Sequence, residues 1–278
     1  MIRKFMGSQD CSNPLVGMVH LDALPGSVRQ TVTLSQAIDR AMREVGSWVD
    51  AGADAIMMEN FFDAPFASES VPPITVACLT TIATALRRNF PNMPIGINCL
   101  RNDGLAALSI AHAVDAQFIR VNVYVGAAVT DQGLIQGQAR VVQLLKRQLS
   151  STVEVWADVF VKHASQLGGA DLRIEDHAKD AVFRGLADAV IVTGTGTGFG
   201  VLTDDLSRVV AAVPQTPVMV GSGYTPETAL TLATAGATGI IVGMAAKEGF
   251  DVSNEVNPLR AKACVRAWKL ALGSCEDE

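Results

Sequence analysis

Short apolar segments recur eight times along this chain of 278 residues, and helical patterns separate them. Four segments share one motif, in which a small-residue helix end and a polar step precede an apolar run: "AGADAIMME" (51–59), "VDAQFIRVN" (114–122), "GLADAVIVT" (185–193) and "AGATGIIVG" (235–243). The other four candidate strands alternate with these: 14–20, 94–99, 153–162 and 217–222. Strands that are apolar almost throughout are typical of a parallel sheet covered by helices.

Helices are predicted between the strands, most clearly over 33–52, 133–149 and 225–236. In the last of these, Thr225 is the expected N-cap and Gly236 follows the helix end. Eight strand–helix units in a chain of this length predict a closed (β/α)₈ barrel, the TIM barrel. We expect a single domain over 1–278, with 1–13 as an N-terminal extension. An open doubly wound sheet is the alternative, but the fourfold repeat favours closure, because the strands of a barrel are nearly equivalent.

Composition limits the classes of function. The net charge is −6 and the basic residues form no run, which argues against binding to nucleic acid. The five cysteines are scattered, with no C-x-x-C spacing, which argues against a zinc site or a disulfide framework. No segment resembles a signal peptide or a membrane span, so we expect a cytoplasmic protein without a transmembrane segment. The mean hydropathy of +0.28 favours a homo-oligomer.

Polar side chains end the first five predicted strands, whereas small residues end the last three. The polar residues are His20, Glu59, Asn98, Arg120, Asn122, Asp158, Lys162 and His163. Active sites of such barrels lie at the carboxyl ends of the strands. Because side chains alternate along a strand, Asp158, Phe160 and Lys162 are expected to face the interior together. We therefore predict a functional site here. The alternative is a structural layer of ion pairs, since buried charges need partners.

Glu59 is the best candidate for a general base, because it ends the apolar run "AIMME" that would desolvate it. The alternative is an ion pair between Glu59 and Arg101 or Arg120. His20 is a further catalytic candidate, and a hydrogen-bonded structural imidazole is the competing interpretation.

Lys162, four residues after Asp158, is a candidate for Schiff-base or proton-transfer chemistry. Both residues are included among the predicted catalytic groups. A divalent metal held by Glu59, Asp158 and His20 is a further hypothesis, which no local ligand spacing supports. No other cofactor is predicted.

Substrate-binding roles are predicted for polar residues around the same mouth: Asn98, Arg101, Arg120, Asn122, His163 and Thr193. Arg101 lies in the third strand-to-helix loop, where its guanidinium can hold a carboxylate or phosphate through two hydrogen bonds. Asn102 or Asp103 next to it is the expected N-cap of the following helix.

Two further histidines, His112 and His177, fall on helical patterns and are predicted to face solvent. The long loops 60–73 and 163–176 are candidate lids over the site. The first contains three phenylalanines, which could instead pack on the barrel rim.

Glycine-rich loops follow the last three strands: "VTGTGTGFG" (192–200), "VGSGYTPE" (220–227) and "IIVGMAAK" (240–247). Glycine lets backbone N–H groups approach an anion closely, and barrels often bind phosphate after strands seven and eight. The predicted phosphate-binding residues are Gly194, Gly196, Gly198, Gly221, Ser222, Gly223 and Gly243. Simple loop flexibility is the alternative explanation of these glycines.

Long motifs of the chain resemble those of the BtpA/SgcQ family. They are "VGMVHLDALPGS" (16–27), "IMMENFFDAPF" (56–66), "GINCLRNDGLAAL" (96–108), "FIRVNVYVGAAVTDQGLIQGQA" (118–139), "ADVFVKHA" (157–164) and "VTGTGTG" (192–198). The resemblance implies a ribulose-phosphate-binding type of barrel, and it links the family's founding member to photosystem I biogenesis. It also implies a departure, because the family's fifth-strand motif carries His where this chain has Phe160.

The expected function is that of a cytosolic barrel enzyme acting on a small phosphorylated metabolite, a sugar or nucleoside phosphate. The expected chemistry is that of an isomerase, an epimerase or an aldolase-like lyase. Two alternatives stay open: a non-catalytic assembly factor for a membrane complex, which the resemblance suggests, and a metal-dependent hydrolase.

Overall fold

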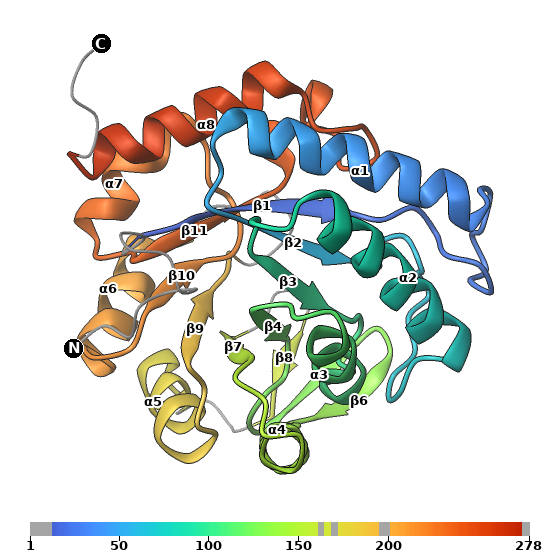
Figure 1. Cartoon of the computed structure of the whole chain (residues 1–278). Coiled ribbons are helices and arrows are strands. Elements are labelled where there is room, and N and C mark those ends of the chain that lie inside the picture. Colours follow the sequence, from blue (N-terminus) through green and yellow to red (C-terminus); the bar gives the residue numbers. More distant parts are fainter. Residues whose placement is uncertain (1–12, 161–163, 168–171, 195–200, 274–278) are drawn as a thin grey trace.

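Parallel strands close into a barrel in the computed structural model of the chain, which describes residues 13–160, 164–167, 172–194 and 201–273. Strands that follow one another around the barrel pair side by side, and the last pairs with the first (Figure 1). The barrel strands are β1 (Leu15–His20), β2 (Ala55–Glu59), β3 (Ile95–Asn98), β4 (Phe118–Val121), β7 (Glu154–Val159), β9 (Ala189–Val192), β10 (Val218–Val220) and β11 (Gly239–Val242). The predicted closed barrel is confirmed, and the open sheet is wrong.

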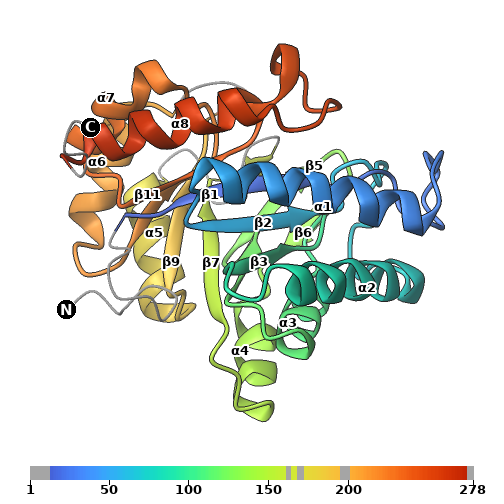
Figure 2. The same cartoon turned by 45° about the horizontal axis from the view of Figure 1, so that its top comes forward.

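The helices form an outer ring around these strands, and α1 lies beside α8 (Figure 2). Their bounds are α1 (Leu34–Ala51), α2 (Pro73–Asn89), α3 (Gly104–Ala113), α4 (Ala139–Gln148), α5 (Ile174–Lys179), α6 (Thr203–Ala212), α7 (Ala229–Thr234) and α8 (Pro258–Ala271). Shorter helical turns are η2 (Asp180–Arg184), η3 (Pro226–Thr228), η4 (Met244–Ala246) and η5 (Glu248–Phe250). Within the described ranges, no helix combines the length and apolarity needed to cross a membrane.

Local sequence explains how α1 is placed. Thr33 caps its start in a reciprocal capping box with Gln36, and Gly52 ends it with φ 78°. Its Trp48 packs directly on Gly17 of β1, where an added Cβ would lie 2.3 Å from the indole ring. The indole Nε1 also donates to the carbonyl of Met18 at 3.1 Å. Glycine at position 17 thus lets the helix approach the strand closely.

Apolar side chains fill the lower part of the barrel. They alternate along the strands and comprise Val16, Met18, Ala55, Met57, Phe118, Trp156, Ala189, Ile191, Met219 and Ile241. The rings of Phe118 and Trp156 stack with centroids 3.9 Å apart. Gly96 makes room for them, because a Cβ there would lie 2.1 Å from Phe118. The interior is therefore a packed floor, and the next inward-facing residues stand above it at the carboxyl ends of the strands.

A small antiparallel sheet accompanies the barrel, and it corrects the helix predicted over 133–149. Strands β5 (Ala127–Thr130), β6 (Gly133–Gln136) and β8 (Ser165–Gln166) form this sheet in the order β6-β5-β8. Gly133 has φ 94° at the hairpin turn, and a Cβ at Gly137 would lie 2.8 Å from the carbonyl oxygen of Tyr124. These two glycines favour a hairpin followed by a close backbone approach, so the helix begins only at Ala139.

The strand predicted over 153–162 is too long, because β7 ends at Val159. Phe160 has φ 52°, which breaks the alternation, and its ring contacts that of His177 with centroids 5.3 Å apart. The prediction that Phe160 shares the interior face with Asp158 is therefore wrong. His177 is also buried, at 6% exposure, where a solvent-facing side chain was predicted, whereas His112 is exposed as expected.

The segment predicted as one helix over 225–236 consists of η3 followed by α7. The backbone N–H of Thr225 donates to the hydroxyl of Thr228 at 3.0 Å, and Gly236 follows the helix with φ 95°. The predicted start and stop signals are confirmed, while the first turn is a 3₁₀ helix.

Candidate functional site

The predicted polar residues lie together at the carboxyl ends of the first barrel strands. In the pairing register His20 is opposite Glu59, Glu59 is opposite Asn98, and Asn98 is opposite Arg120. These four buried side chains therefore stand at one level above the apolar floor. Asn122 follows β4, and Asp158 lies in β7. The barrel thus brings polar groups from five strands into one layer.

The carboxylate of Glu59 accepts a hydrogen bond from Asn98 and lies close to the imidazole of His20. The Nδ2 group of Asn98 donates to its Oε2 atom at 2.8 Å, and the Nε2 atom of His20 lies 3.6 Å from its Oε1 atom. Its closest ion-pair partner in the described structure is thus His20, and no ion pair within 4 Å joins it to Arg101 or Arg120. A buried carboxylate next to an imidazole is suited to accepting and passing on a proton.

Both carboxylate oxygens of Asp158 accept hydrogen bonds, which come from Arg120 and Asn122. The Nε and Nη2 groups of Arg120 each lie 3.0 Å from one carboxylate oxygen, and the Asn122 amide donates to Oδ2 at 2.7 Å. Burial opposes the charge of the guanidinium, but the carboxylates of Asp158 and Glu59 outweigh it, so the pKa of Arg120 is raised. This arrangement assigns Asp158 to holding Arg120 in place. The predicted layer therefore contains one structural ion pair.

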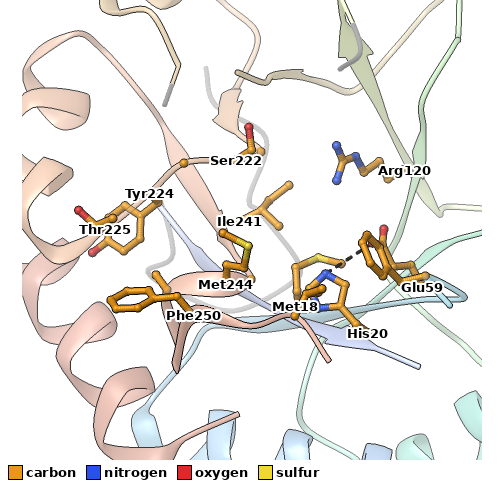
Figure 3. Close-up of a pocket in the computed structure, with 16 residues that line it drawn as sticks. Met18, His20, Glu59, Arg120, Ser222, Tyr224, Thr225, Ile241, Met244 and Phe250 are labelled. Atoms are coloured by element: carbon orange, nitrogen blue, oxygen red, sulfur yellow. Dashed lines mark ion pairs between the residues drawn. The ribbon is translucent and has the colours of Figure 1, made fainter. Parts of the chain in front are cut away.

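A pocket of ≈ 300 Å³ opens on the side of β1, β10 and β11 (Figure 3). It is lined by Met18, His20, Glu59, Phe61, Arg120, Gly221, Ser222, Gly223, Tyr224, Thr225, Ile241, Gly243, Met244, Ala245, Phe250 and Val252. The small residues at the ends of β10 and β11 create this space. A Cβ on Gly221 would lie 2.5 Å from the Ile191 side chain, and one on Gly243 would lie 3.0 Å from the His20 ring.

Two loops that line the pocket, those after β10 and β11, contain backbone N–H groups without an acceptor in the described structure. Among the described residues, the N–H groups of Ser222, Gly223, Met244 and Ala245 donate to no protein acceptor. The Ser222 hydroxyl accepts from the N–H of Gly194 at 2.8 Å, so its own hydrogen can point elsewhere. We call these four N–H groups and the Ser222 hydroxyl the anion cradle. Backbone N–H groups on residues that line one pocket suit a phosphate group.

Other predicted residues lie outside the lining of the pocket. Asn98, Asn122 and Thr193 each keep a buried side-chain oxygen with no hydrogen-bond partner in the described structure. Arg101 is buried, which lowers its pKa, although the carboxylate of Asp158 opposes this effect. Asn98, Asn122 and Thr193 lie at or just after the ends of β3, β4 and β9. Four predicted residues, Lys162, His163, Gly196 and Gly198, lie outside the described residues.

The loop after β3 is fastened by two polar side chains. Asp103 caps α3 by accepting from the N–H of Ala106 at 2.8 Å, which confirms it as the N-cap. Its other oxygen accepts from the N–H of Val71 at 2.9 Å, so it also ties down the loop 60–73. Asn102 exchanges two hydrogen bonds with the backbone of Val123. Asp103 and Asn102 therefore hold the loops at the mouth of the barrel in place.

The phenylalanines of loop 60–73 contact the rim. The ring of Phe61 lies against that of His20 with centroids 4.9 Å apart, and Phe62 packs against Phe61. Packing on the barrel rim, the second of the two predicted roles of this loop, therefore describes these two residues. Phe61 also lines the pocket.

Sequence reasoning missed the apolar lining of the pocket, notably Tyr224, Met244 and Phe250. Their only sequence signal is their position directly after the glycines of the last two strand-to-helix loops. For a metal, the described residues contain no group of three or more His, Cys, Asp or Glu side chains placed to bind one.

Comparisons with known proteins agree with the barrel. The sequence model of the BtpA family matches residues 11–269. The photosystem I biogenesis protein BtpA of Synechocystis is 42% identical, over 94% of this chain and 90% of its own. Among solved structures, thiamine phosphate pyrophosphorylase from Pyrococcus furiosus aligns with a TM-score of 0.60 at 15% identity, covering 94% of this chain and 98% of its own. The 3-hexulose-6-phosphate synthase from Salmonella typhimurium aligns with a TM-score of 0.59 at 15% identity, covering 94% and 100%. Likeness at such low identity shows the fold alone.

Proposed function

The chain belongs to the BtpA family, and we propose that it is an enzyme that transfers protons on a small phosphorylated metabolite, a sugar or nucleoside phosphate. The reaction class is isomerase, epimerase or lyase. One observation carries the proposal: a single pocket contains both the anion cradle and the buried carboxylate of Glu59.

Phosphate occupies the cradle in this proposal. The donors come from the loops after β10 and β11, and the glycines there allow backbone N–H groups to reach a ligand without intervening side chains. The names of solved structures with the same fold, such as the hexulose phosphate synthase, support a phosphorylated ligand for this chain.

Glu59 acts as the general base, and His20 beside it accepts or returns the proton. Arg120 provides positive charge at the same end of the pocket, since Asp158 fixes its guanidinium through Nε and Nη2, while Nη1 makes no hydrogen bond within the described residues. A fixed cation facing the ligand stabilises negative charge that develops when a proton leaves carbon. The predicted roles of Lys162 and His163 stay predictions.

A thermal-shift screen tests the phosphate assignment. Ribose 5-phosphate and inorganic phosphate are compared with ribose, the matched compound without phosphate. Ligand at about 100 times its dissociation constant should stabilise the protein by about 2.7 kcal/mol, which raises the melting temperature. If neither phosphate compound shifts the transition, the cradle does not bind phosphate and the proposal fails.

The alternative of a non-catalytic assembly factor draws on the name of the Synechocystis relative. It is favoured by exposed apolar side chains on the small sheet and directly after it, namely Val129, Leu134 and Leu167, which are 46–53% exposed. The two functions can be distinguished by a growth test in a cell that depends on this protein. Loss of growth with Glu59→Gln supports the enzyme, whereas loss with Leu134→Ser and not with Glu59→Gln supports the assembly factor.

A further inference from the structure

We propose that the phosphorylated ligand of this pocket carries an aromatic ring, which packs against the exposed ring of Phe250. This inference rests on the proposed function, because it assumes that the cradle holds a phosphate. It favours ring-bearing phosphate esters, such as a nucleoside phosphate or an aryl phosphate, over simple sugar phosphates as the ligand.

The pocket has a polar end and an apolar end. Glu59, His20 and Arg120 lie on one side of Figure 3, whereas Tyr224 and Phe250 lie on the opposite side. Met244 and Val252 add further apolar surface to the lining. Thr225 beside Tyr224 offers one hydroxyl, but a sugar would bring several hydroxyl groups that need hydrogen-bond partners, and these four side chains offer few. An apolar ring matches this end of the pocket better.

Phe250 is an apolar side chain that the protein leaves exposed. Its exposed fraction is 54%, although it lines the pocket. The guanidinium of Arg260 lies 3.7 Å from its ring centroid, and the Nε group of Arg260 donates to the carbonyl of Ala245 at 3.1 Å. Arg260 therefore covers one face of the ring and fixes it to the loop that carries the cradle. A ligand ring would bury part of the surface that remains in solvent.

Tyr224 forms the wall at this end of the pocket, and it is rigid and 4% exposed. Its hydroxyl donates to the carbonyl of Cys264 at 2.7 Å, and its ring packs edge-on against Trp268. Because that hydroxyl is already engaged, the small part of Tyr224 that lines the pocket is apolar, and Phe250 offers the exposed ring. Both aromatic side chains are thus held in place before a ligand arrives, which favours stacking over hydrogen bonding to sugar hydroxyls.

Calorimetric titration of the full chain with four probes tests the inference: uridine 5′-monophosphate, phenyl phosphate, ribose 5-phosphate and inorganic phosphate. At least one ring-bearing probe should bind about tenfold more tightly than ribose 5-phosphate, the gain expected for one stacked ring. The two ring-bearing probes distinguish a nucleoside phosphate from an aryl phosphate.

The variant Phe250→Ala should remove most of this preference while leaving the affinity for ribose 5-phosphate unchanged. Phe183→Ala is the matched control, because Phe183 is similarly exposed, at 65%, and lies on η2 away from the pocket. Equal binding of ribose 5-phosphate and both ring-bearing probes would overturn the inference, as would a preference that survives Phe250→Ala. If none of the four probes binds, the proposed phosphate site itself is wrong.

Discussion

The ammonium group of Lys247 lies 2.7 Å from each carboxylate oxygen of Glu44, and both side chains are completely buried. This pair joins the loop after β11, which carries Met244 and Phe250, to helix α1. Burial raises the pKa of Glu44 and lowers that of Lys247, and each partner opposes the shift of the other. The position of one pocket wall therefore depends on a buried ion pair outside the pocket.

Replacing Lys247 by Met should destabilise the protein by up to about 3–5 kcal/mol, because buried Glu44 then keeps only Arg40, whose Nε lies 3.3 Å from its Oε1 atom. Urea unfolding followed by circular dichroism measures the loss. The double variant Lys247→Met/Glu44→Leu should recover much of it, since neither charge is then buried alone. Lys262→Met, at an exposed position of α8, is the control and should change stability by less than about 0.5 kcal/mol. A single variant as stable as the wild type would contradict this account.

Glu59→Gln should lower the rate of proton exchange at carbon in a bound phosphate ester by about 10²–10⁴-fold, since the amide cannot act as a base. Proton NMR in D₂O measures the exchange of carbon-bound hydrogens, with ribulose 5-phosphate as a ring-free probe that the same cradle can hold. Binding of inorganic phosphate should persist, because the cradle is unchanged. Glu69→Gln, in the exposed part of loop 60–73, is the matched control. Undiminished exchange with Glu59→Gln would remove Glu59 from the mechanism.

Gly243→Ala should weaken phosphate binding by about tenfold or more, a loss of roughly 1.4 kcal/mol. The added Cβ would lie 3.0 Å from the His20 ring, so it narrows the pocket and displaces a catalytic candidate. Titration with inorganic phosphate checks the effect. Gly46→Ala is the control: its Cβ would meet nothing within 4 Å, and in the middle of α1 it should stabilise the protein by about 0.5–1 kcal/mol. Wild-type affinity in Gly243→Ala would argue against the cradle.

His177 should make stability depend on pH in the acid range. Burial lowers its pKa below the ordinary value of 6.5, although Asp180 opposes the shift. Below pH 6.5 the unfolded chain therefore binds a proton that the folded protein does not, and stability decreases as the pH falls towards the lowered pKa. The substitution His177→Leu should flatten this decrease in urea unfolding between about pH 7.5 and 5. His112→Gln, at an exposed position, should leave the decrease as it is. An unchanged profile in His177→Leu would refute the assignment.

Much of the fold could be predicted because its signals are local. Apolar strands and small-residue helix ends recur along the chain. Polar residues end the strands from the one with His20 to the one with Asp158, and glycines end the last strands. The same local logic failed at Gly133 and Gly137, where an apolar pattern suggested a helix but backbone contacts with the strand before it produced a hairpin. It failed again at Phe160, whose positive φ ends the alternation on which the prediction depended.

The sequence by itself determined the barrel and the level at which the polar residues stand. Side chains alternate along each strand, and strands that follow one another in the sequence lie next to one another in the barrel. Only the tertiary structure decided which of those polar residues form a buried ion pair and which line the pocket. It couples Asp158 to Arg120 in a buried ion pair, and it places Glu59 with the glycine loops around one pocket. Such contacts depend on how far side chains reach across the barrel, and on the space that Gly221 and Gly243 leave open. Neither quantity is encoded in the spacing of residues along a strand.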